Sequence, residues 1–143
     1  MSDKSGWEDG PWQTEPDQMQ WRSSGLPCLL ARNQLGVWCG YVGVPLGHPV
    51  HGQDHEKVHV EVHGGLTFSG TYTRQCGFYG EPADVWWLGF DCGHGYDYLP
   101  GFQSLTPQMM PYGDPANYKT IAYAQAEVER LALQLSKLPW QCN

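Results

Sequence analysis

The feature that most constrains the fold is a single amphipathic stripe near the C-terminus. Apolar residues recur there at steps of three and four, with glutamine and glutamate on the opposite face. The apolar positions are Ile121, Val128, Leu131, Leu135 and Leu138. Asp114-Pro115 is a good helix start and Pro139 a stop, so the pattern predicts one helix of about 22 residues. One stripe is what a helix needs to lie on a sheet, and we favour this over a partner-binding coil.

The body of the chain has the patterns of strands. Short apolar runs flank a turn at Asn33–Gly36 and predict an antiparallel hairpin over 28–44. Residues 58–63 alternate strictly, with valine on one face, and Gly64-Gly65 leads to an expected return strand at 66–72. Residues 85–90 are almost continuously apolar, as in a strand covered on both faces. The sequence therefore predicts an α+β domain, an antiparallel sheet of about five strands packed against one long C-terminal helix.

The N-terminal 26 residues differ from the rest of the 143-residue chain in composition and in their lack of a regular pattern. Trp7, Trp12 and Trp21 lie among glycine, proline and acidic residues without a regular period. We therefore expect an irregular Trp-rich arm over 1–26 and a single domain over 27–143. The arm either lies in grooves of its own domain or embraces a neighbouring subunit, which would give a homo-oligomer.

Charge and cysteine content exclude several classes of protein. The formal net charge is −7, but five of the fifteen acidic residues fall within the first 17 positions, so the body is nearly balanced. Binding of polymeric nucleic acid needs a basic face, which this chain lacks. No apolar run is long enough to span a membrane, and the start lacks the apolar stretch of a secretory signal. Five cysteines without a C-x-x-C pair indicate reduced thiols, and we expect a cytoplasmic protein.

Polar residues that could carry chemistry cluster at two turns. His63 stands where a predicted strand meets Gly64-Gly65, a common way to present an imidazole. Asp91, His94 and Asp97 follow the buried run 85–90, and they could act as a general base with an orienting acid. If His63 faces this turn, then His63, Asp91 and His94 could also hold one divalent metal, zinc or manganese. The alternative is that Asp91 and Asp97 cap turns through the backbone and His94 is a bonded loop residue.

A second set of residues is expected to contact the ligand. The 45–56 loop contains three of the six histidines, and loops held by a sheet often carry sites. The expected contacts are His48, Gly64, Gly65, Thr67, Cys92 and Trp87. Cys92 also permits a thiol nucleophile with His63 or His94 as base, but the glycines that follow it oppose the helix start that would activate it.

Several motifs resemble one protein family. They are Gly40-Tyr41-Val42-Gly43-Val44-Pro45, Gly47-His48-Pro49, Val62-His63-Gly64-Gly65-Leu66-Thr67 and Gly89-Phe90-Asp91-Cys92-Gly93-His94, with Asp97 and the C-terminal helix after them. In this order they resemble a family of small uncharacterised proteins encoded by bacteriophages and prophages, over residues 26–136. The resemblance implies a viral or prophage source, and the family's distinctive polar positions fall on His48, His63, Asp91, His94 and Asp97.

Two functions follow as expectations. In the first, the protein is a hydrolase-like enzyme that acts on a small polar substrate through His63, Asp91, His94 and Asp97, either with a bound metal or without one. In the second, it is a non-catalytic counter-defence protein that binds and sequesters a nucleotide-like small molecule. Both place the site at one end of the sheet.

Overall fold

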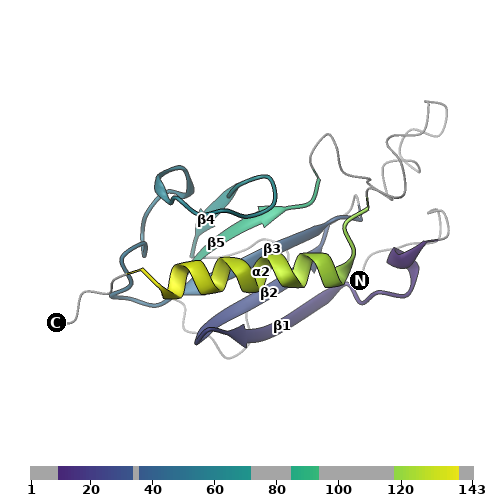
Figure 1. Ribbon diagram of the computed structural model, residues 1–143, viewed down its shortest axis with the longest axis horizontal. Helices are drawn as coiled ribbons and strands as arrows, with labels where there is room; N and C mark the ends of the chain where they lie inside the picture. The colour runs from purple at the N-terminus through teal and green to yellow at the C-terminus, as the bar shows by residue number, and fades with distance from the viewer. Residues whose placement is uncertain (1–9, 34–35, 72–84, 94–117, 139–143) are drawn as a thin grey trace.

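The fold is an α+β arrangement of one antiparallel sheet and one helix, which confirms the predicted fold class. The computed structural model describes residues 10–33, 36–71, 85–93 and 118–138. Five strands are hydrogen-bonded in the order β1-β2-β3-β5-β4, and the helix α2 lies against them (Figure 1). The elements are β1 (Gln18–Ser23), β2 (Leu26–Arg32), β3 (Trp38–Val44), β4 (Phe68–Gly70), β5 (Trp86–Asp91) and α2 (Ile121–Ser136), with 3-10 turns η1 (Pro11–Gln13) and η2 (His55–Lys57).

The predicted hairpin forms the centre of the sheet. β2 pairs antiparallel with β3, with Leu30 opposite Gly40, and every residue of both strands is buried. The Asn33 side chain accepts a hydrogen bond from the Val37 N–H, and Gly36 takes a φ of 81°, a conformation that other residues rarely adopt. The turn chemistry read from the sequence thus produces the expected connection.

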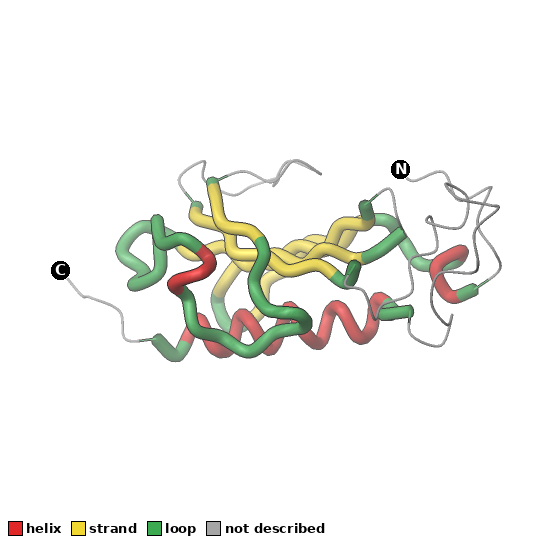
Figure 2. The backbone as a smooth tube through the Cα atoms, turned by 90° about the horizontal axis from the view of Figure 1, so that it is seen from above, coloured by secondary structure: helices red, strands yellow, loops and turns green. Residues whose placement is uncertain are grey.

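Helix α2 covers one face of the sheet, as Figure 2 shows from above. Val128, Leu131 and Leu135 are fully buried in the main core together with Leu30 and Phe90. Close approach depends on Gly40, because a Cβ there would lie 2.6 Å from the Val128 side chain.

The helix is shorter than predicted. It has 16 residues and begins after Thr120, whose side chain caps it by accepting a hydrogen bond from the Tyr123 N–H. A start at Asp114-Pro115 is wrong because residues 118–120 precede the helix without being helical; residues 114–117 lie outside the described ranges. A threonine cap satisfies the first free amides as well as the expected aspartate would have.

The second face of the sheet carries its own apolar cluster of Leu29, Cys39, Tyr41, Val85 and Trp87, with Phe68 against it. Since β5 alternates between this cluster and the main core, it is buried on both faces, as the apolar run predicted.

The prediction of a strand over 58–63 is wrong, although its burial pattern holds except at His63, which is buried. Val58 and Val62 are buried and His59 and Glu61 exposed, but none of them pairs with a strand in the described part of the chain. The expected return strand is reduced to β4, which pairs with β5 instead. Alternation indicates which side chains are buried, but it does not indicate where the backbone N–H and C=O groups find their hydrogen-bond partners.

The irregular Trp-rich arm is not confirmed. Residues 18–23 of that segment form β1, an edge strand paired with β2. Trp12 is buried with its ring 4.9 Å from that of Tyr118, and the Trp21 indole N–H donates to Glu129 of α2. Trp7 lies outside the described residues. Both described tryptophans of the segment thus pack on their own chain.

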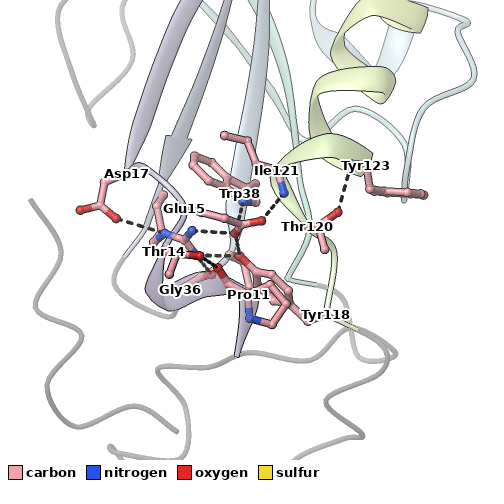
Figure 3. A network of polar contacts seen from close by, with 12 residues as sticks. Pro11, Thr14, Glu15, Asp17, Gly36, Trp38, Tyr118, Thr120, Ile121 and Tyr123 are labelled. Carbon is pink, nitrogen blue, oxygen red and sulfur yellow. Dashed lines mark hydrogen bonds and ion pairs between the residues drawn. The ribbon is translucent and has the colours of Figure 1, made fainter. Parts of the chain in front are cut away.

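A buried polar network fixes the segment before β1 to the sheet and the helix (Figure 3). Arg32, 6% exposed, donates to Glu15, Asp17 and Tyr118, and its guanidinium lies 4.4 Å from the centre of the Trp38 ring.

Glu15 is the centre of this network. Its carboxylate accepts hydrogen bonds from Arg32, from the Tyr118 hydroxyl and from the Ile121 N–H at the start of α2. Burial raises the pKa of Glu15, but the bonds from Ile121, Tyr118 and Arg32 and the Arg32 charge outweigh burial and hold that pKa below its ordinary 4.5.

Candidate functional site

Asp91, at the end of β5, is joined to another predicted site residue. Its carboxylate accepts one hydrogen bond from the Thr67 hydroxyl at 3.1 Å and one from the Gly93 N–H at 2.9 Å. The second bond closes a turn, which is the alternative role considered for this residue. Asp91 pairs with Cys39 of the second cluster, so its side chain points away from the face that α2 covers.

His63 contacts the helix. The residue is 8% exposed; its N–H donates to Glu127 and its Nδ1 lies 2.8 Å from the Tyr123 hydroxyl. Gly64 and Gly65 take φ values of 67° and 81° and form the predicted turn directly after it. Because Asp91 points to the opposite face, the described geometry does not bring His63 and Asp91 to one site.

His48 supports the fold from inside. It is buried; Nδ1 accepts from the Val50 N–H, and Nε2 lies 2.8 Å from the Leu135 carbonyl near the end of α2. These two bonds define the neutral tautomer with the proton on Nε2. Burial lowers the pKa of His48 below its ordinary 6.5.

Cys92 and Trp87 are each 1% exposed. Cys92 belongs to the main core and Trp87 to the second cluster, on opposite faces of the sheet. Cys28, Cys39 and Cys92 are buried free thiols, and burial raises the pKa of Cys28 to about 12. Among the described cysteines, none is thus presented as an exposed nucleophile.

His94 and Asp97 lie outside the described residues, so the structure does not describe the complete set of predicted catalytic residues. Within the described ranges, no group of three or more His, Cys, Asp and Glu side chains could hold a metal ion. No helix in this part of the structure is long and apolar enough to cross a membrane.

An open hollow of about 520 Å³ lies where sequence reasoning did not place the site. Its lining is His55, Glu56, Val58, His59, Val60, Glu61, Gly65, Leu66 and Gln134. Only Gly65 of this set was expected to contact a ligand. The signal for the rest was present in the histidine-bearing loop 45–56 and in His59 and Glu61, whose exposure the alternation predicted.

Local bonds shape this hollow. Ser69 accepts a hydrogen bond from the His55 N–H at 3.1 Å, and its hydroxyl lies 3.2 Å from His55 Nδ1. Asp54 caps η2 by accepting from the Glu56 N–H. The hollow therefore combines two imidazoles, two carboxylates and a few apolar side chains on a fixed backbone.

No family model matches the chain, and comparisons with curated proteins and with solved structures return no match either.

Proposed function

We propose that this chain is a non-catalytic binding protein that holds its ligand in the hollow between residues 55 and 66. The observation that carries the proposal is the hollow itself, an open depression of about 520 Å³ that brings apolar and ionisable side chains together. Its apolar walls, Val58, Val60 and Leu66, supply contact area, and its imidazoles and carboxylates supply orientation. A phage or prophage source and action in the host cytoplasm enter the proposal through the motif resemblance.

The bonding of the predicted catalytic groups supports binding over chemistry. His48 and His63 contact α2, and both oxygens of Asp91 accept hydrogen bonds from the chain. Groups whose hydrogen bonds hold the fold together are poorly placed to exchange protons with a substrate.

The ligand carries neutral or positive groups toward the hollow. Glu56 and Glu61 line it, and a nucleotide phosphate would meet like charge there. Of the nucleotide-like ligands expected from the sequence, a nucleoside without phosphate is the one compatible with this lining.

The test is ligand retention. Protein incubated with lysate of phage-infected bacteria is purified and compared by native and denaturing mass spectrometry. We expect an intact ligand to be released from wild type and from Gln18→Ala, a control on the exposed part of β1, and retention to fall at least tenfold in His59→Ala and Glu61→Ala. Equal retention in all four proteins, or none in any, would contradict the proposal.

A second candidate is the hydrolase-like enzyme, favoured by one observation. Thr67 and Asp91 are joined by a hydrogen bond at the end of the sheet, and Asp91 shortly precedes His94 and Asp97 in the sequence. Under this candidate, turnover in a panel of small polar esters, amides and phosphates falls about a hundredfold or more in Asp91→Asn. It remains unchanged in His59→Ala, which separates the two candidates. Absence of turnover in wild type across the panel would reject the enzyme.

A further inference from the structure

The extended segment 58–62 is attached to α2 along one edge by side chains. The Gln134 amide pairs with Glu61 as a strand residue would: its Oε1 accepts from the Glu61 N–H at 2.8 Å, and its Nε2 donates to the Glu61 carbonyl at 2.7 Å. Two residues on, Glu127 accepts from the His63 N–H at 2.8 Å. Figure 2 shows the connection from η2 to β4 passing alongside α2. One edge of the segment is therefore satisfied without any neighbouring strand.

The other edge of the segment is open. In an extended chain the amide groups of successive residues point to opposite edges, so those of Val60 and the N–H of Val62 point away from Gln134 and Glu127. Throughout the described ranges, no hydrogen bond engages the N–H or carbonyl of Val60 or the N–H of Val62. These groups form the unpaired edge of an extended segment. Val62 is buried in the main core, so Val60, which is half-buried and lines the hollow, is the residue at which a further strand can pair.

The hollow runs along this segment and is acidic. Val58, His59, Val60 and Glu61 all line it, and Glu56 adds a second carboxylate from η2. No lysine or arginine is among the residues that line the hollow, so no fixed positive charge there opposes a cationic partner. A small molecule could fill part of the hollow but could not match backbone groups that recur every second residue.

We infer that the open edge of residues 58–62 binds an extended basic peptide by antiparallel strand addition, which rests on the proposed binding function. The peptide backbone pairs with Val60. Alternate apolar side chains of the peptide lie on the side of Val58 and Val60. The intervening lysine or arginine side chains lie beside the exposed Glu61. The occupant is thus a segment of another protein with alternating apolar and basic residues.

Isothermal titration calorimetry with a capped heptapeptide, Lys-Val-Lys-Val-Lys-Val-Lys, tests the inference. Antiparallel pairing turns the amides of the valine residues toward Val60. N-methylation of those valine amides is expected to weaken binding about tenfold or more, because at least one backbone hydrogen bond is lost. N-methylation of the lysine amides changes affinity less than about twofold and is the matched control. Equal affinity of the two methylated peptides overturns strand addition.

A pair of protein variants tests the charge. Glu61→Gln removes one negative charge from the hollow, and Gln18→Lys makes the same net change on β1, where residue 18 is exposed. We expect Glu61→Gln to weaken peptide binding about two- to fivefold and Gln18→Lys to leave it within the error of the measurement. An equal effect of both variants, or tighter binding of a Glu-Val peptide, overturns the assigned ligand.

The outcomes separate the inference from the function on which it rests. If the peptide fails to bind but an intact small molecule is still released from wild type and lost in Glu61→Ala, the binding function stands and the peptide assignment is rejected. The protein could instead bind a second copy of itself and form a dimer, which sedimentation would detect. If Glu61→Gln does not weaken that dimer, the basic partner is rejected. If nothing binds in either experiment, both are rejected.

Discussion

Gln134 completes the backbone hydrogen bonds of Glu61 from a half-buried position on α2. Each such bond contributes about 0.5 to 1.5 kcal/mol net, and the exposure of Glu61 reduces that value. We therefore expect Gln134→Ala to lower the free energy of unfolding by about 1 to 2 kcal/mol. Urea denaturation measures this directly. Gln125→Ala, also half-buried on α2, is the control, and an equal loss in both variants would show that the amide pairing contributes nothing specific.

His48 makes stability depend on pH. The unfolded chain binds a proton at the ordinary His pKa of 6.5, whereas burial lowers the pKa of folded His48, so the unfolded state holds more protons at intermediate pH. The stabilisation is complete above the unfolded value and is lost as the pH falls below it. Thermal or urea unfolding between about pH 7.5 and 5.5 should show this slope.

Substitution separates His48 from the other histidines. In His48→Gln the slope over that range should shrink, while in His59→Gln, which changes an exposed histidine, it should remain. An unchanged slope in His48→Gln would contradict the assignment. Glu15 acts in a separate range: the pKa of its folded form is lowered, so its contribution is lost only as the pH falls below its ordinary 4.5.

The same residues show why the site was only partly predictable. The neighbouring glycines drew attention to His48 and His63, but a histidine buried for hydrogen bonding and one presented to a ligand have the same local sequence. Thr67 and Asp91, both predicted site residues, are joined by a hydrogen bond between positions 24 residues apart. No local pattern reports such a bond, because the fold creates it.

Among the elements, the prediction from the sequence agrees best with the structure where burial alone decides the local fold. The hairpin of β2 and β3, the doubly covered β5 and the stripe of α2 all follow from apolar patterning. β1 was missed although Met19 and Trp21 alternate with polar residues, because its glutamines and arginine weaken the strand signal. The segment 58–63 was assigned as a strand because its pairing with side chains of α2 leaves no trace in its own sequence.

The buried network of Arg32 joins three elements: the turn before β1, the inner strand β2 and the start of α2. Removal of Arg32 alone would leave Glu15 buried among neutral donors without its counter-charge. We expect Arg32→Met to destabilise the protein by about 3 to 5 kcal/mol, measured by urea denaturation.

Two companion variants check this reading of the network. The double variant Arg32→Met/Glu15→Gln should recover part of the loss, since it also removes the orphaned charge. Arg22→Met, on the exposed part of β1, should cost less than about 0.5 kcal/mol. A double variant as unstable as the sum of the two single changes would contradict the assigned ion pair.

At the scale of the molecule, one helix closes one face of a sheet, and the long connection from β3 to β4 lies beside that helix (Figure 1). This connection carries His48 inward to the end of α2 and then passes the hollow before it returns to the sheet. The central claim about this connection is that residues 60–63 are held to α2 through alternate amides only, which leaves the other edge open.

Amide hydrogen exchange of residues 60–63, followed by NMR in the free protein, tests that claim most directly. The Glu61 and His63 amides, bonded to Gln134 and Glu127, should be protected, and that of the half-buried Val60 should exchange much faster. Protection of all three amides would mean that the segment is a paired strand without an open edge. Fast exchange of all three would mean that α2 does not hold it, and either result would contradict the account.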